Sequence, residues 1–355
     1  MGTLTAVILA ILIFSFLIFI HELGHFTAAK LSGVQVNEFS MFMGPALFKK
    51  QWGETQYTLR LIPLGGYCAM EGEDGDSDNP RAFGKAKWWK RLIILVAGAA
   101  MNFLAGLVLL CIFYSPWETF VIPEVSSVDP QSCLAGYMEA GDRILRLDGE
   151  TIYDTSDFDL LMTLNPRETH ELVLKRQGKE VTYTDLIIEK REITDKEGES
   201  LLRYGFSFTL ENATFGATLR QVWRTAANTV RMVRLSLKML FTGRAGLKDL
   251  GGPVMIVDMM AQTAGASEDS LQAFMSLIYF GAFLGINLAV MNLLPIPALD
   301  GGRVACLLIT QMIEGITHKK VNPKYEGFIN AAGMVLLLGL MGIIMFKDIF
   351  VIFKR

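Results

Sequence analysis

The sequence has little charge and few of the residues that usually bind metals or form cross-links. Charged residues make up 19% of its 355 positions, against about 25% in an average soluble domain, while 51% are hydrophobic. Its four cysteines are scattered without CxxC spacing, which argues against a disulfide scaffold and a cysteine-ligated metal site. The formal net charge of −3 gives no basic field, so nucleic acid is not expected as a partner.

The apolar residues are concentrated in four runs. Residues 3–20 carry no charge and form a membrane-span candidate, for which about 20 apolar residues are needed. A signal peptide would need a basic n-region and a cleavage site, whereas this run continues directly into His21 and Glu22. The sequence therefore predicts an α-helical protein of the lipid bilayer with four transmembrane helices, at 1–32, 91–115, 273–314 and 328–355.

The connections between these helices differ in basic residues. Lysines and arginines are frequent in the connections 33–90 and 315–327, which the positive-inside rule places in the cytoplasm. The middle region is then extracytoplasmic, with an α+β domain at 116–200 and an amphipathic helical linker at 201–272. Arginines between 220 and 244 oppose this orientation, but long translocated domains escape the rule. We expect a multi-pass protein of the cell membrane.

Alternating residues predict strands between the first two helices. Val36–Phe42 and Gln56–Leu64 alternate and are separated by turn signals, so a β-hairpin or small sheet against the membrane is expected. The acidic stretch 71–80 reads as a solvated loop. In the middle region, residues 172–179 predict a hairpin. Residues 216–240 predict a helix. Packing against a neighbouring element and lying on the membrane surface are equally good interpretations of this helix.

Residues 21–25 form an HExxH motif. On a helix, positions i and i+4 share a face, so His21 and His25 can bind one Zn²⁺, with Glu22 beside them as a base for water. The sequence has only four histidines, which makes a chance match the weaker alternative. Unpaired ionisable groups within an apolar span are costly and usually mark a functional site. The motif therefore predicts a zinc site at or within the bilayer.

A catalytic zinc usually keeps three protein ligands and one water, so a third ligand is needed. The candidates are Glu38, His170, His318 and Asp300. Glu38 lies on the predicted sheet, and both histidines are expected to be solvated. Asp300 follows two prolines that break the helix, and a carboxylate after such a break can turn inward to a metal. Capping of the following helix is an equally good interpretation of Asp300 on this reasoning.

Several motifs together carry a family resemblance. They are HELGH at 21–25, LIPLGGY at 61–67, GAAMN at 98–102, GPV at 252–254 and NLLPIPALDGGR at 292–303, with an AG…AGD…LDG run between 135 and 149. The sequence resembles the site-2 protease family of intramembrane zinc metalloproteases over essentially its whole length. Within that family it is most similar to the bacterial regulator-of-sigma-E protease branch.

The resemblance implies the roles of six residues. By it, the zinc ligands are His21, His25 and Asp300, the base is Glu22, and the residues that help to hold substrate are Asn102 and Asn292. It also implies one PDZ domain in the middle region. Ala99 departs from the family, which has proline there, and the family's glycine-rich FSIGFGP stretch reads FSMFMGP at 39–45, with Phe42 in place of a glycine. The second departure affects the shape of the predicted sheet.

The resemblance further implies a metalloendopeptidase of regulated intramembrane proteolysis. Its expected partners are single-pass membrane proteins, such as anti-sigma factors or remnant signal peptides, cut on the cytoplasmic side. A transmembrane helix must unwind before cleavage, and an edge strand from Val36–Phe42 or Gln56–Leu64 is expected to hold it by strand addition. The PDZ-like domain would act as a gate or a size filter for substrates already trimmed outside.

Three other classes of protein are weaker interpretations. A membrane-anchored PDZ adaptor would need no HExxH motif. A transporter would use broken helices and intramembrane charges, but four spans without internal repeats support it poorly. A zincin with simple membrane anchors would place HExxH outside the bilayer.

Overall fold

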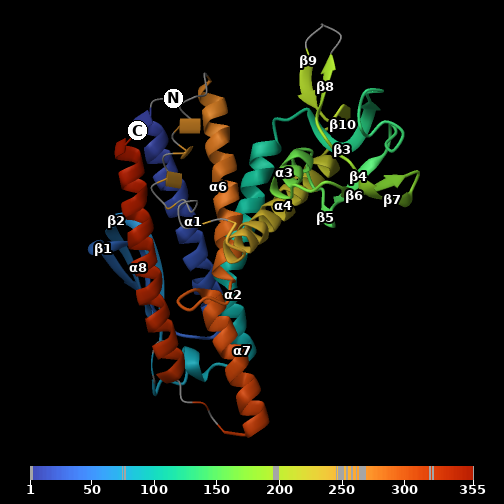
Figure 1. Ribbon diagram of the computed structural model, residues 1–355. Helices are drawn as coiled ribbons and strands as arrows, with labels where there is room; N and C mark the ends of the chain where they lie inside the picture. The colour runs from blue at the N-terminus through green and yellow to red at the C-terminus, as the bar shows by residue number, and fades with distance from the viewer. Residues whose placement is uncertain are drawn as a thin grey trace. The chain divides into compact units, whose positions relative to one another are not determined.

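The computed structural model describes residues 3–73, 75, 77–194, 200–244, 246, 252, 255–256, 259–260, 262–263, 269–319, 321 and 324–354 (Figure 1). The chain forms two compact units, which we name the helical unit and the sheet unit. The helical unit comprises Met1–Phe113 and Thr229–Arg355, and the sheet unit comprises Tyr114–Asn228. The GPV motif and the acidic stretch 71–80 lie partly outside the described residues.

Four helices are long and apolar enough to cross a membrane. Their candidate spans are Val7–Ser32 in α1 (Thr3–Ser32), Trp88–Tyr114, which is all of α2, Ser270–Asn292, which is all of α6, and Gly327–Asp348 in α8 (Lys324–Lys354). A helix satisfies its backbone polar groups internally, as an apolar bilayer requires. In the part of the chain that the structure describes, these four candidates correspond to the four predicted spans.

The predicted helix at 273–314 is two helices in the structure. Helix α6 ends at Asn292, and a separate helix α7 begins at Asp300 and ends at Thr317. The segment between them contains Pro295 and Pro297, which lack an amide hydrogen for the helical ladder. Ala298 has a φ of 76° and redirects the chain before α7. The proline break therefore ends the span and presents the first turn of α7 to the interior of the unit.

Glycines allow the spans to approach each other closely. A Cβ at Gly24 of α1 would lie 2.4 Å from the carbonyl oxygen of Ala97 in α2. A Cβ at Gly106 of α2 would lie 2.6 Å from Ile286 in α6. Small residues at helix crossings are the usual means of close packing in membranes. These contacts hold α1 against α2, and α2 against α6, the two helices that carry the asparagines named above.

Strands β1 (Val36–Trp52) and β2 (Thr55–Met70) form the sheet expected after α1, and both contact α1. Each strand bends and pairs twice. Phe39 has partners in both Tyr57 and Cys68, while Tyr57 also pairs with Lys50. The segments around Phe39 and Tyr57 are therefore interior, and the outer segments are Gly66–Met70 and Phe48–Trp52.

This arrangement corrects the expected edge strand. Glu38–Met41 and Gln56–Leu59 have strand neighbours on both sides, so they offer no free backbone row for another chain. In the part of the chain that the structure describes, Gly66–Met70 pairs on one side only. The sequence identified the strands, but the pairing order depends on how each one bends.

The turn of this sheet is tied to the ends of two helices. Glu54 accepts hydrogen bonds from Arg81, which precedes α2, and from Lys30 in the last turn of α1. These two cations lower the pKa of Glu54 to about 2, the bonds from Arg81 having the larger effect. The carboxylate therefore stays charged at neutral pH and links the sheet to the helices.

The sheet unit contains a six-stranded sheet and a separate hairpin. The elements of the sheet unit are β3 Thr119–Val128, β4 Arg143–Leu147, β5 Glu150–Thr151, α3 Ser156–Leu164, β6 His170–Arg176, β7 Lys179–Leu186, β8 Arg191–Thr194, β9 Ser200–Arg203 and β10 Phe206–Asn212. The helical unit has in addition a short 3-10 helix at Phe83–Lys85. The order along the six-stranded sheet is β10-β3-β4-β6-β7, with β5 paired to β4, and the separate hairpin is formed by β8 and β9. The hairpin expected at 172–179 is confirmed by β6 and β7.

One expectation in the middle region is corrected and another is confirmed. Strands β9 and β10 lie in the segment 201–272 that was expected to be a helical linker, and β10 pairs along β3 from Asn212 to Phe206. The sheet therefore continues past residue 200, because its last strand returns to pair with its first. The helix expected at 216–240 is present as α4 (Phe215–Phe241).

His170 is also not the solvated residue that the sequence suggested. It is 3% exposed, and its Nδ1 lies 2.8 Å from Oδ2 of Asp148. Asp148 occupies the turn before β5 with a φ of 52° and also accepts from the amide of Glu171. His170 therefore links the start of β6 to the turn before β5.

Candidate metal centre

Helix α1 brings the two histidines of HExxH together. His21 and His25 are one turn apart, their ring centroids are 4.7 Å apart, and their Nε2 atoms lie 3.1 Å from each other. Both rings are therefore directed at one point beside the helix.

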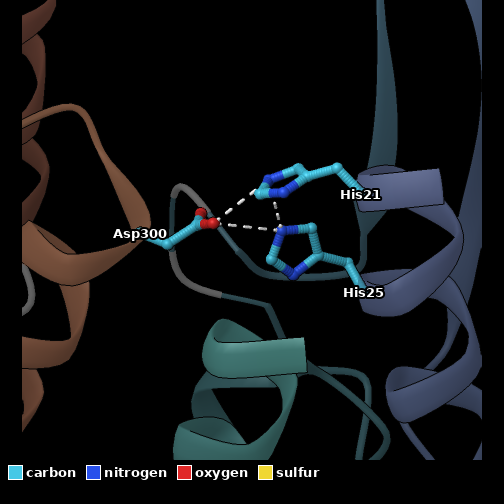
Figure 2. Close-up of side chains that lie close together, drawn as sticks. All are labelled: His21, His25 and Asp300. Carbon is cyan, nitrogen blue, oxygen red and sulfur yellow. Dashed lines mark hydrogen bonds and ion pairs between the residues drawn. The ribbon is translucent and has the colours of Figure 1, made fainter. Parts of the chain in front are cut away.

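Asp300 reaches the same point from the first turn of α7. Its Oδ2 lies 3.1 Å from Nε2 of His21 and 3.3 Å from Nε2 of His25 (Figure 2). The three side chains are 9% to 17% exposed. The N-cap of α7 is Leu299, so the carboxylate of Asp300 is directed at the histidines rather than standing at the cap position. Only the proline break and the packing of α7 bring it there.

These three atoms suit a tetrahedral metal ion. Ligands at about 2.0–2.1 Å from zinc are separated by about 3.3–3.4 Å in a tetrahedron. The observed separations of 3.1, 3.1 and 3.3 Å are close to this value. Oδ2 of Asp300 is buried, and the polar atoms beside it are the Nε2 atoms of the two histidines. The chemistry also suits zinc, since two imidazoles and a carboxylate leave a fourth position open.

His25 is oriented by the backbone of α2. Its Nδ1 lies 2.8 Å from the carbonyl oxygen of Ile94, which can only accept a hydrogen bond. Nδ1 therefore carries the proton, and Nε2 presents a lone pair to the metal position. A Cβ at Gly98 would lie 2.3 Å from Nε2 of His25, so only glycine leaves room for the ring.

His21 faces two amides. Nδ2 of Asn102 in α2 and Nδ2 of Asn292 at the end of α6 each lie 3.4 Å from Nδ1 of His21. Asn102 is 1% exposed, whereas Asn292 is half-buried. Both predicted asparagines therefore lie next to Nδ1 of His21, while Nε2 of the same ring faces the metal position.

Glu22 lies beside the outer segment of β2. A Cβ at Gly66 would lie 3.4 Å from Cγ of Glu22 and 3.1 Å from the carbonyl oxygen of Ser40. Gly66 therefore leaves space next to the carboxylate of Glu22, on the strand segment that pairs on one side only.

The other candidate ligands lie elsewhere. Glu38 accepts a hydrogen bond from Arg60 at 2.9 Å within the sheet. His170 pairs with Asp148 in the sheet unit, and His318 is the exposed C-cap of α7. The metal-ligand cluster found among the described residues consists of His21, His25 and Asp300.

Sequence reasoning missed an ion pair next to the site. Glu73, assigned to a solvated acidic loop, pairs with Arg303, which lies one turn after Asp300 in α7. The second carboxylate oxygen of Glu73 accepts from the amide of Met70 at the end of β2. The pair thus connects the outer segment of β2 with the helix that carries Asp300. Glu73 is one of several acidic residues in this stretch, and nothing in the sequence marks it as the partner of Arg303.

The HExxH motif in a membrane-span candidate, joined by an aspartate from a second helix, defines a membrane zinc metalloprotease. The sequence matches Peptidase family M50 over residues 9–340. The chain belongs to this family, the site-2 proteases, and is a zinc-dependent enzyme.

Similar proteins extend over nearly the whole chain. A relative from Clostridium perfringens, provisionally named a zinc metalloprotease, is 38% identical over 97% of this chain and 98% of its own length. One from Clostridium acetobutylicum with the same provisional name is 38% identical over 97% of each chain. The regulator of sigma-W protease of Bacillus subtilis is 27% identical over 97% of this chain and 98% of its own. The family predicted from the sequence motifs is therefore confirmed.

Proposed function

We propose that this enzyme cleaves transmembrane segments of other membrane proteins within the bilayer. The observation that carries the proposal is the meeting of His21, His25 and Asp300 on a helix whose Val7–Ser32 segment is a membrane-span candidate. A metal centre on such a segment can reach peptide bonds that soluble proteases cannot reach.

The proposal assigns a role to each residue of the centre. His21 and His25 hold Zn²⁺ through Nε2, and Asp300 holds it through Oδ2. Zinc supplies Lewis acidity, which activates water and polarises the scissile carbonyl. Glu22 accepts the proton of the attacking water and passes it to the leaving amine. The glycines at 66 and 98 keep the space around Glu22 and His25 open.

Substrate is held in an extended form beside Glu22. A transmembrane helix has its backbone groups paired internally, so it must unwind before its carbonyl can react. The outer segment Gly66–Met70 offers a backbone row for strand addition and passes next to Glu22. Asn292, half-buried at the end of α6, is available to bond the freed backbone. The proposed edge strand is therefore Gly66–Met70, in place of Val36–Phe42 or Gln56–Leu64, which were expected from the sequence.

The substrates are single-pass membrane proteins, either anti-sigma factors or remnant signal peptides. The name of the Bacillus subtilis relative, a regulator of sigma-W protease, supports the first group. In this proposal the sheet unit is a PDZ-like extracytoplasmic domain that filters substrates by size, and the metal centre lies toward the cytoplasm. The enzyme would then act in regulated intramembrane proteolysis.

The proposal is tested with Glu22→Gln. An amide cannot accept the proton, so the purified variant should retain zinc and fold but lose at least about 100-fold in cleavage of a model transmembrane substrate, the lower range for a general base. The control is the same substrate with its apolar segment shortened to a soluble peptide. Near-normal cleavage by Glu22→Gln would remove Glu22 as the base. Equal cleavage of the soluble control would contradict the intramembrane site.

A further inference from the structure

We propose that Asn102 is a positioning residue that holds the proton of His21 on Nδ1 and so makes Nε2 available to zinc. The inference rests on the proposed function, because it assumes that His21 binds the metal through Nε2. It gives the two asparagines different tasks, although both lie at the same distance from the same atom.

His25 shows what such positioning requires. The carbonyl of Ile94 accepts from Nδ1 of His25, so the proton has one place and Nε2 is free. His21 is supported by side-chain amides in place of a backbone carbonyl. Its Nδ1 faces amide groups instead, and an amide can either donate through nitrogen or accept through oxygen.

The amide of Asn102 can meet Nδ1 of His21 in either of two orientations. With Nδ2 of Asn102 toward Nδ1 of His21, the amide donates and the ring proton must sit on Nε2, facing Oδ2 of Asp300 at 3.1 Å. Zinc at Nε2 requires the other tautomer, with the proton on Nδ1. A half-turn of the Asn102 amide exchanges its nitrogen and oxygen, so that Oδ1 accepts this proton.

Burial selects Asn102 for this task over Asn292. Asn102 is 1% exposed, and its Oδ1 is buried without a hydrogen-bond partner. The half-turn gives Oδ1 the Nδ1 proton of His21 as its partner and so stabilises the metal-binding tautomer. Asn292 is half-buried and can bond to water or substrate instead.

The test measures zinc affinity rather than turnover. Full-length protein carrying Glu22→Gln is reconstituted in nanodiscs, and its zinc dissociation constant is measured by chelator competition. Asn102→Leu should weaken zinc binding by about 10–100-fold, the range for lost partners of a metal ligand. Asn102→Asp should restore affinity to at least the parent value, because a carboxylate accepts the Nδ1 proton. Asn292→Leu, the matched control, should change affinity less than about threefold.

Each outcome bears on one claim. Parent-like zinc affinity in Asn102→Leu, or no recovery in Asn102→Asp, would overturn the positioning role. If the leucine variant is unstable without metal, Asn102→Ala and Asn102→Asp are compared instead, and equal affinities would be just as damaging. Weak zinc binding by the parent itself would count against the proposed function, whereas a normal parent with a silent Asn102 would count only against this inference.

Discussion

Asp300 begins α7, and its Oδ2 lies within 3.3 Å of both histidine Nε2 atoms. At this scale the question is whether the carboxylate binds metal or only stabilises the helix. The two roles respond differently to the loss of one charge, since asparagine caps a helix about as well as aspartate but is a poorer metal ligand.

Asp300→Asn should therefore lower zinc content after mild chelation, with a loss of affinity of at least about 10-fold, and activity should fall with it. The thermal unfolding of the metal-free protein should be nearly unchanged. Zinc content is measured per chain beside cleavage of a model transmembrane substrate. Full zinc retention with full activity would show that Asp300 is not a ligand.

The ion pair between Glu73 and Arg303 should position α7. Arg303 lies one turn after Asp300, and its guanidinium is 22% exposed against 14% for the carboxylate of Glu73. Glu73→Gln and Arg303→Gln should each weaken zinc binding several-fold. In the double variant the losses should not add, leaving a coupling of about 1 kcal/mol in a double-mutant cycle. Strictly additive losses would show that the pair does not act as a unit.

At the scale of elements, the metal position depends on how closely α1 and α2 approach. Gly24 meets the backbone of α2, and Gly98 leaves room for the ring of His25. Interiors are too closely packed to absorb a methyl group without a shift. The helix crossing therefore sets the position of the histidines.

Gly98→Ala should displace His25, since its new Cβ would lie 2.3 Å from Nε2. We expect zinc affinity to fall by at least about 10-fold, as for other disturbed ligand supports. The matched control is Gly339→Ala in α8, where a Cβ meets no atom within 4 Å. The measurement is zinc competition on both variants. Equal affinity in the two would contradict the steric account.

At the scale of the whole molecule, the sheet unit contains none of the proposed ligands. Its last long strand lies beside its first, since β10 pairs with β3 and the amide of Ala213 donates to the carbonyl of Glu118 at 2.8 Å. The two ends of the segment Thr119–Asn212 are thus adjacent, and this segment can be excised and replaced by a short linker. A cut that spared β10 would leave that strand without its partner.

Excision of Thr119–Asn212 should leave zinc content and peptide hydrolysis intact, because the ligands are all in the helical unit. Selectivity should fall. One model substrate lacks a bulky extracytoplasmic domain and a second carries one. We expect the ratio of their cleavage rates to approach one in the excised protein. The rates are measured in the same proteoliposomes. An unchanged ratio would count against the size filter, and so would loss of activity in a zinc-loaded excised protein.

The features determined by the sequence alone are local ones. Apolar runs of sufficient length predict spans, and the i, i+4 spacing of His21 and His25 places both rings on one helix face, because each depends only on residues close along the chain. The family followed from several such short motifs taken together.

Only the tertiary structure decided the contacts between distant residues. Asp300 could cap a helix or face the histidines until α7 was placed, and Glu73 had no visible partner until Arg303 lay beside it. The bends in β1 and β2 made the expected edge strands interior, and β10 returned to β3. Such pairings depend on packing and on where a chain turns back, which residue type and spacing do not specify.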